Sequence, residues 1–481
     1  MITLQGNRLS RAAYSALTGE ARTTPPVRIV HLGLGAFHRA HQAWFTAQVD
    51  DEAEWGIAAF TGRNPQAALE LAPQDGLFTL VERSEAGDSA TIVTSIVEAV
   101  DGANLDRLRE LLAAPTTSIV TLTVTEAGYR LTADGLPNLT DPAVAADVAW
   151  LTTAFSAAVL PATHDDGPTT TLGRLLLGLE GRRRAAAGPI AIVPCDNIPD
   201  NGPFLARGLG ALARSISGAT ADWIDAEVSF VSTSVDRITP RTTPADLATA
   251  CDLTGWQDDA AVVTEPFRDW VLSGNFPGGR PAWERAGARF VDDIEPFEQR
   301  KLWMLNGAHS LLAYDGLLRG HETVAEAMAD PVCRDRVNTW WDDVVLHLPG
   351  EGLALDDYRA ALIIRFDNAR IEHRLAQISG EAVTKLRVRI VPTVLAERAA
   401  GRDAAAGIRA IGSWVALVLR GYPLVDADAV AVATALAGGA AEVIERLVTL
   451  IDPRLVADAA ALAAIRAVVD DSASGSGPHQ G

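Results

Sequence analysis

The sequence predicts an α/β protein, in which an N-terminal Rossmann-type doubly wound sheet domain precedes a mostly α-helical C-terminal domain. Two observations support this. Short β-branched runs alternate with helix-length segments through the first 285 or so residues, the pattern of a parallel α/β sheet. From Phe297 onward, Ala, Leu and Val recur at helical spacing with few strand-like runs. We therefore expect a sheet domain at residues 1–287, a helical domain at 288–471 and a flexible tail at 472–481.

The expected elements follow from these runs. Buried parallel strands read as short, nearly continuous apolar segments. They are expected at residues 27–32, 57–60, 119–124, 190–194 and 228–231. Long helices are expected at residues 171–186, 301–314, 403–420 and 427–450.

The composition excludes several classes of protein. The 481 residues include 41 Lys plus Arg and 61 Asp plus Glu, a net charge of −20, which argues against nucleic-acid and acidic-membrane partners. The three cysteines (Cys195, Cys251 and Cys333) are scattered and form no CxxC pair, so neither a disulfide framework nor a Cys-rich zinc site is expected. The sequence contains no long apolar run and no signal peptide, and we expect a cytoplasmic protein.

A glycine turn follows the first expected strand. In dinucleotide-binding folds the first glycine makes a tight turn, and the second lets the backbone approach the pyrophosphate at a helix N-terminus. The third glycine of that pattern is replaced here by histidine. The turn therefore predicts a nucleotide site, and the alternative is a plain strand-to-helix turn. The candidate cofactor-binding residues are Gly33, Gly35, Ala36, Phe37 and His38.

The second expected strand lacks the acidic residue that holds the adenosine ribose in typical NAD sites. The chain instead reads Phe60-Thr61-Gly62-Arg63. Arg63 is a candidate for a 2′-phosphate, and the alternative is a solvated surface arginine. The expected cofactor is NAD, with NADP left open.

Four polar side chains share one face of the helix expected from residue 301. At about 100° per residue, Glu298 lies near 60°, His309 near 80° and Asn306 near 140° from Lys301. A desolvated, neutral lysine can take the proton of a substrate hydroxyl while the carbon gives up hydride, and an amide can stabilise the alkoxide. Histidine would orient a hydroxyl, and Glu298 would pass the proton onward. The alternative is a Glu–Lys ion pair, a capping asparagine and a core histidine.

Two further polar groups follow expected strands, at the edge where ligands bind in doubly wound sheets. Asn197 follows the strand at 190–194 and is a second candidate to hold the alkoxide; the alternative is an Asx turn. Asp236 is a candidate ligand of sugar hydroxyls, or else a cap or a partner of Arg237.

Competing chemistries lack their motifs. None of the five tyrosines has a lysine four residues later, and the scattered cysteines do not suggest a zinc site. Neither a GxSxG elbow nor a GxxxxGK[ST] loop is present. Lysine-based hydride transfer without a metal survives this elimination.

The chain resembles the mannitol dehydrogenase family of polyol-specific long-chain dehydrogenases over roughly residues 26–400. The matching stretches are GLGAFHRAHQA (33–43), PQDGLFTL (73–80), TVTEAGY (123–129), PCDNI (194–198), SVDRITP (234–240), EPFRDW (265–270), GRPAWE (279–284) and KLWMLNGAHS (301–310). The resemblance implies two domains with the active site between them and metal-independent catalysis.

The family's residue roles carry over to matching positions. The resemblance implies that Lys301 is the base, that Asn197 and Asn306 hold the alkoxide, that His309 orients the substrate and that Glu298 belongs to the proton path. It also implies substrate contacts at Val235, Asp236 and Lys385.

The main departure lies near the second substrate cluster, where Gln377 stands in place of an arginine, as in members resembling fructuronate reductases. A carboxylated substrate also needs a cation, and Lys385, Arg387, Arg389 and Arg374 are near in sequence. The leading hypothesis is an NAD(P)-dependent dehydrogenase acting at C2, with D-mannonate/D-fructuronate ahead of D-mannitol/D-fructose. A non-catalytic sugar or nucleotide sensor is the alternative from another class. A monomer or weak homodimer is expected.

Overall fold

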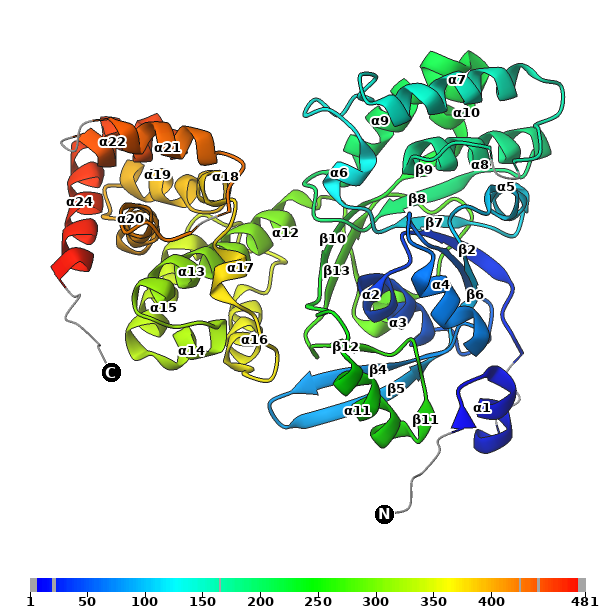
Figure 1. The fold of residues 1–481 in the computed structure, drawn as a ribbon, viewed down its shortest axis with the longest axis horizontal. Coiled ribbons are helices and arrows are strands. Elements are labelled where there is room, and N and C mark those ends of the chain that lie inside the picture. Colours follow the sequence, from blue (N-terminus) through cyan, green and yellow to red (C-terminus); the bar gives the residue numbers. More distant parts are fainter. Residues whose placement is uncertain (1–6, 20–22, 164–165, 424, 439–441, 475–481) are drawn as a thin grey trace. The chain divides into compact units, whose positions relative to one another are not determined.

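The computed structural model describes residues 7–19, 23–163, 166–423, 425–438 and 442–474, and it divides into two compact units. The first unit is Met1–Ile294 and the second is Glu295–Gly481 (Figure 1). The division follows Ile294, whereas the boundary expected from the sequence follows residue 287. Helix α12 (Glu295–Arg300) opens the second unit.

The first unit is built on a six-stranded parallel sheet. Its strands lie in the order β6 (Ile96–Val100), β3 (Gly56–Phe60), β2 (Val27–Leu32), β7 (Ile119–Leu122), β8 (Ile190–Pro194) and β9 (Val228–Phe230). Renumbered along the chain, this order is 3-2-1-4-5-6, the doubly wound order with its switch point between β2 and β7. The Rossmann-type prediction is confirmed.

Alternate residues of each strand pack into separate cores on the two faces of this sheet. Ile29, for example, packs in one core with Phe45, whereas Val30 packs on the opposite face with Leu108. Helices cover the face of Val30 (Figure 1). They are α5 (Leu105–Ala113), α7 (Pro142–Ser156), α8 (Thr171–Ala185), α9 (Asn201–Ile216) and α10 (Gly218–Glu227).

The other face is covered by a helical run and by small sheets that the sequence did not predict. The run joins α2 (Ala36–His38), the π-helix η1 (Arg39–Ala43) and α3 (Trp44–Ala47). The small sheets are β4 (Phe78–Ser84) with β5 (Gly87–Val93) and β12 (Val262–Thr264), and β10 (Ser232–Asp236) with β13 (Asp269–Ser273) and β14 (Arg289–Phe290). A two-stranded pair, β1 (Asn7–Arg8) with β11 (Trp256–Gln257), lies apart in a small cluster with Leu9 and Leu77.

Shorter helices complete the first unit. They are α1 (Arg11–Thr18), α4 (Gln66–Leu71), η2 (Ala72–Gln74), α6 (Glu126–Tyr129), α11 (Pro244–Thr254) and η3 (Trp283–Ala286).

Helices are the only regular secondary structure in the described residues of the second unit, apart from one isolated β-bridge between Thr323 and Arg374. Its helices after α12 are the π-helix η4 (Lys301–Gly307), α13 (Ala308–Leu318), α14 (Val324–Ala329), α15 (Pro331–Val345), α16 (Leu355–Asp367), α17 (Leu375–Ile378), α18 (Ala382–Arg389), α19 (Val391–Ala399), α20 (Ala405–Leu419), α21 (Ala429–Ala437), α22 (Val443–Ile451), α23 (Pro453–Ala457) and α24 (Ala459–Ser474). The helical prediction for this region is confirmed.

Two details differ from the sequence-based expectation. The single helix expected over residues 427–450 is two helices, α21 and α22, because α21 ends just before Gly438, a residue that disfavours a helix interior. The tail expected from residue 472 begins inside α24, which ends at Ser474, and residues 475–481 lie outside the described residues.

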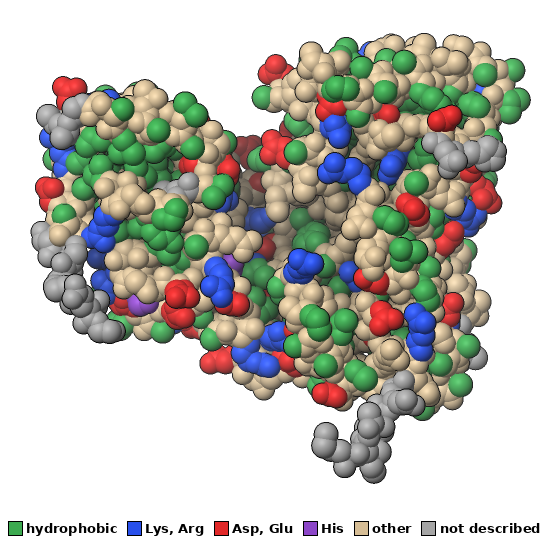
Figure 2. Space-filling view, in the orientation of Figure 1, with side chains coloured by type: hydrophobic (Ala, Val, Ile, Leu, Met, Phe, Trp, Pro, Cys, Tyr) green, Lys and Arg blue, Asp and Glu red, His purple; other side chains and the backbone are tan. Residues whose placement is uncertain are grey.

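On the face seen in Figure 2, acidic and basic side chains are both spread over the surface. Within the described residues, no helix combines the length and hydrophobicity needed to cross a bilayer.

Candidate active site

The turn after β2 has the backbone that a dinucleotide needs. Gly33 has φ +110°, and a Cβ atom there would lie 2.3 Å from the carbonyl oxygen of Thr123, so only glycine fits. Gly35 is extended, and a Cβ on it would meet only Gly33 O, at 3.6 Å. Gly35 also precedes the helical run 36–47 and provides no side-chain cap, which leaves the first amides of that run for an anion. The chemistry of this turn fits a pyrophosphate.

The missing third glycine is explained by two stacked histidines. That glycine ordinarily permits close packing of helix on strand. Here the His38 ring lies flat on that of His31 from β2, with ring centroids 3.3 Å apart and planes 7° apart. Burial lowers the pKa of His31 to about 3 and that of His38 well below its usual value, so the stack is uncharged. The flat, neutral ring of His38 thus allows the helical run to pack closely on β2.

A narrow cleft lies beside Gly33 at the carboxyl edge of the sheet, next to the topological switch point. It is lined by residues that include Gly33, Thr61, Gly102, Val124 and Arg174. The predicted Arg63 is exposed on the loop after β3. Arg174 was not singled out from the sequence; it comes from α8 and donates to the carbonyl oxygen of Gly62 at 3.4 Å.

The turn that carries Asn197 is held by its neighbour Asp196. Asp196 Oδ1 accepts from the Ile198 amide at 3.1 Å, so the side chain that forms an Asx turn here is that of Asp196. Its Oδ2 accepts a 2.6 Å hydrogen bond from the hydroxyl of Tyr129, in α6. Burial raises the pKa of Asp196, and the hydrogen bonds from Tyr129, the Ile198 amide and Asn201 oppose that rise. Asn197 itself is exposed at the tip of this turn.

The Asn197 turn and strand β10 are joined by one buried amide. The side chain of Asn201 donates to the carbonyl oxygens of Pro194 at 3.2 Å and Thr233 at 3.0 Å, and it accepts from the Thr233 amide at 2.9 Å. The first unit therefore brings Asn197 and the end of β10, with Val235 and Asp236, to one edge.

Asp236 is not the partner of its neighbour Arg237. The guanidinium of Arg237 instead pairs with Glu82 and donates to the carbonyl oxygens of Ala40 at 2.6 Å and Glu265 at 3.1 Å. Val235 is buried within β10 and Asp236 is half-buried at its end.

In the second unit the predicted Lys301–Asn306 segment is a π-helix, not the regular α-helix assumed from the sequence. A π-helix bonds residue i to i+5, which widens each turn. The 140° separation expected for Asn306 is therefore wrong, because the wider turn brings Asn306 nearer to the face of Lys301. Such π segments frequently mark functional sites.

Two tryptophans of α15 stabilise this π-helix. The indole N–H groups of Trp340 and Trp341 donate to the carbonyl oxygens of Trp303 at 2.9 Å and Met304 at 2.8 Å. A Cβ on Gly307 would lie 2.8 Å from the Trp340 ring, so glycine admits the indole. These bonds satisfy carbonyls inside the widened turn.

The remaining predicted residues of this unit differ in exposure. Glu298, Lys301 and Asn306 are half-buried, and Gln377 in α17 is exposed. His309 is buried, with a ring centroid 4.7 Å from that of Phe366 and 4.8 Å from that of His373.

Each unit therefore carries its own part of the predicted set. The first unit holds Asn197, Val235 and Asp236, and the second holds Glu298, Lys301, Asn306, His309, Gln377 and Lys385.

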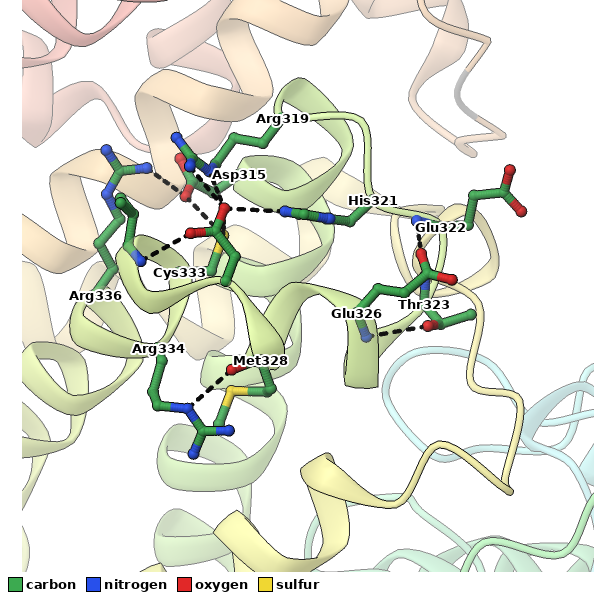
Figure 3. A network of polar contacts seen from close by, with 12 residues as sticks. Asp315, Arg319, His321, Glu322, Thr323, Glu326, Met328, Cys333, Arg334 and Arg336 are labelled. Atoms are coloured by element: carbon green, nitrogen blue, oxygen red, sulfur yellow. Dashed lines mark hydrogen bonds and ion pairs between the residues drawn. The ribbon is translucent and has the colours of Figure 1, made fainter.

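A separate polar cluster in the second unit places three metal-ligand types within 4.8 Å of one another: His321, Asp330 and Cys333 (Figure 3). Their charges are already balanced. Asp330 Oδ2 accepts from Arg319 at 2.6 Å and contacts His321 Nε2 at 3.0 Å, and Asp315 beneath Cys333 pairs with an arginine of α15. We interpret the cluster as an ion-pair network that joins α13 to α15.

Comparison with known proteins follows this division into two units. The model of the mannitol dehydrogenase Rossmann domain matches residues 27–285, and that of the mannitol dehydrogenase C-terminal domain matches residues 293–430. The chain belongs to the mannitol dehydrogenase family. It is thereby an NAD-dependent oxidoreductase.

Relatives within this family are named after two different substrates. The chain is 36% identical over 380 residues to the D-mannonate oxidoreductase of Escherichia coli strain K12, covering 76% of this chain and 75% of the relative. It is 36% identical over 384 residues to a mannitol 2-dehydrogenase of Aspergillus fumigatus, covering 76% and 73%. The solved ternary complex of Pseudomonas fluorescens mannitol 2-dehydrogenase with NAD and D-mannitol has a TM-score of 0.75 at 29% identity, covering 96% of this chain and 99% of that one.

Sequence reasoning missed the supporting residues of this mannitol dehydrogenase family site. His31, Tyr129, Asn201, Trp340 and Trp341 act through contacts with elements distant in sequence. Tyr129 lies in the quoted TVTEAGY stretch, and that stretch was the one available signal for it.

Proposed function

We propose that this protein interconverts D-fructuronate and D-mannonate by hydride transfer at the C2 ketone of fructuronate. The Lys-x4-Asn-x2-His pattern carries the proposal. Its lysine and asparagine lie on a π-helix stabilised by two buried indoles and its histidine lies in the following helix α13, in a family of NAD-dependent oxidoreductases. The D-mannonate oxidoreductase relative and the glutamine at position 377 favour the sugar acid.

The proposed roles follow from the chemistry of each side chain. In the oxidative direction Lys301 takes the hydroxyl proton, and the amides of Asn197 and Asn306 stabilise the alkoxide. His309 orients a neighbouring hydroxyl, and Glu298 passes the proton toward water. Bound NAD supplies the hydride acceptor.

Contacts with the rest of the substrate complete the proposal. Val235 and Asp236 contact substrate hydroxyls, and Lys385 supplies a basic contact. Gln377 occupies the place of the arginine of mannitol-specific members. The turn with Gly33, Gly35, Ala36, Phe37 and His38 holds the pyrophosphate, and Arg63 lies toward the adenosine ribose.

The first experiment is an initial-rate panel with D-fructuronate and D-fructose, each with NADH and NADPH. We expect fast turnover of D-fructuronate with NADH. Fast turnover of D-fructose alone would contradict the sugar-acid assignment and favour D-mannitol/D-fructose, the pair suggested by the mannitol 2-dehydrogenase relatives. Tight NADH binding without turnover of either sugar would point instead to a non-catalytic sensor.

The base is tested by Lys301→Ala, which should lower kcat by several orders of magnitude while NADH still binds. Asn306→Ala should cost about 2.7–4 kcal/mol in the transition state, the usual loss of one oxyanion donor. Gln299→Ala, whose side chain bonds to Glu295 at 2.9 Å, is the neighbouring control and should behave as wild type. A fully active Lys301→Ala enzyme would disprove the assignment.

The proposal extends to the setting of the reaction. Three free cysteine thiols suit a reducing cytoplasm, where NAD and small sugar acids are found. We propose a small-molecule substrate as the partner, and a monomer or weak homodimer as the assembly, to be checked by sedimentation equilibrium.

A further inference from the structure

Helix α18 places two cations beside the π-helix without a carboxylate partner. Lys385 and Arg389 lie four residues apart and so share a face. Arg389 Nη1 reaches only uncharged oxygens at long range, Asn306 O at 3.5 Å and Ser310 Oγ at 3.4 Å, and Lys385 Nζ donates to Ile378 O at 2.8 Å. Neither forms an ion pair with a carboxylate anywhere in the part of the chain that the structure describes.

This arrangement is unfavourable for the protein alone. Like charges one helical turn apart repel each other, and both side chains are partly withdrawn from water. Burial lowers the pKa of Arg389, and burial together with the charge of Arg389 lowers the pKa of Lys385 to about 8. The carboxylates of Glu381 and Asp426 oppose the lowering of the Lys385 pKa, but neither forms a hydrogen bond or ion pair with Lys385 or Arg389 among the described residues. Both cations therefore remain available to bond an anionic ligand.

The other two basic residues considered from the sequence do not share this environment. Arg387 is exposed and donates to the carbonyl oxygens of Leu450 at 2.7 Å and Ile451 at 3.0 Å. Arg374 is exposed and pairs with Glu372. The structure thus separates Lys385 and Arg389 from their neighbours in sequence.

A buried histidine completes the group. His309 is 7% exposed, and its Nε2 atom has no hydrogen-bond partner within the described residues. Burial first, and then nearby cations that include Arg389 and Lys385, hold the pKa of His309 well below its usual value. A neutral imidazole nitrogen that can bond a hydroxyl therefore lies among groups that attract a carboxylate.

We infer that Arg389, with Lys385 beside it, binds the carboxylate of the sugar-acid substrate, while His309 bonds a hydroxyl. The inference rests on the proposed function and identifies how its substrate is chosen. D-fructuronate carries its carboxylate at C6, where D-fructose carries a hydroxymethyl group, so a guanidinium at that end separates the two. Arginine suits the task because its planar N–H groups bond both carboxylate oxygens.

The test measures binding rather than turnover. Isothermal titration of the enzyme–NADH complex, which cannot oxidise an alcohol, gives Kd for D-mannonate and for D-mannitol. Wild type should prefer D-mannonate, and Arg389→Met should lose at least about tenfold of that preference, or about 1.4 kcal/mol. Arg389→Lys should retain part of it.

Arg387→Met, from the same helix, is the matched control and should keep the wild-type preference. Lys385→Met provides a second variant if Arg389→Met does not fold, and should also lose part of the preference. The inference is overturned if wild type binds both ligands equally, or if Arg389→Met weakens both equally, because Arg389 would then act only by supporting Asn306. A failure of the proposed function shows itself separately, as a wild-type enzyme that does not reduce D-fructuronate.

Discussion

The two glycines of the turn after β2 should respond differently to alanine. Gly33 has φ +110° and lies against Thr123, whereas Gly35 is extended and a Cβ there would make only an ordinary contact with Gly33 O. Gly33→Ala should therefore damage the folded protein itself. Gly35→Ala should leave the protein intact and damage only its approach to the pyrophosphate.

The magnitudes follow from the geometry. At Gly33 the strained backbone costs about 1–3 kcal/mol and the overlap of a Cβ 2.3 Å from Thr123 O costs about 1–3 kcal/mol more, or roughly 2–6 kcal/mol in all. That should lower Tm by at least roughly 4 °C. At Gly35 the new methyl meets Gly33 O at 3.6 Å, an ordinary contact, so the free energy of unfolding should change by less than about 1 kcal/mol. Its Kd for NADH should rise at least about tenfold.

Thermal unfolding of the ligand-free protein and fluorescence titration with NADH separate the two effects. The reasoning is refuted if Gly33→Ala melts with wild type, since the contact with Thr123 would then impose no constraint. A Gly35→Ala protein that binds NADH with wild-type affinity would show that no pyrophosphate comes close to this backbone. Gly62→Ala, on the neighbouring loop with open space around its Cβ position, is the control for both measurements.

Two other perturbations test the second unit. Trp341→Phe removes the indole hydrogen bond to the Met304 carbonyl of the π-helix, which should destabilise the protein by about 0.5–1.5 kcal/mol and lower kcat; unchanged kcat in a destabilised variant would show that the π-helix does not depend on this bond. Asp330→Asn should destabilise by about 1–2 kcal/mol at pH 7. Because the hydrogen bond from Arg319 above all holds the pKa of Asp330 far below its usual value, this stabilisation is present above the unfolded pKa of about 4 and is lost as the pH falls further. Urea titrations at pH 7 and pH 3 should show the difference between wild type and variant shrinking; a constant difference would exclude the carboxylate as its source.

Patterns local in sequence predicted the sheet well. Each strand expected at 27–32, 57–60, 119–124, 190–194 and 228–231 is present within two residues, because a strand buried on both faces must be apolar along its whole length. The glycine turn was equally predictable, because the close contact of Gly33 with Thr123 tolerates only glycine.

Features that depend on residues distant in sequence could not be predicted from the sequence. His38 substitutes for a glycine only because His31 offers it a flat face, and the π-helix depends on indoles from α15. The sequence alone does not distinguish the four basic residues from Arg374 to Arg389. On α18, the separation of the exposed Arg387 from the partly buried Lys385 and Arg389 follows from which face of the helix packs against η4 and α13. Arg374 lies outside α18, at the start of α17.

The π-helix at Lys301–Gly307 has a consequence for how this gene can change. A single π turn holds one residue more than the α-helical turn it interrupts. Deleting one residue of the segment would let the helix close to regular α geometry, and the flanking helices would face nearly as before because the wide turn had absorbed the extra residue. The carbonyl oxygens of Trp303 and Met304 would no longer lie in a widened turn, where the indoles of Trp340 and Trp341 now reach them. A change in the length of this segment is therefore tied to a change in the two tryptophans of α15.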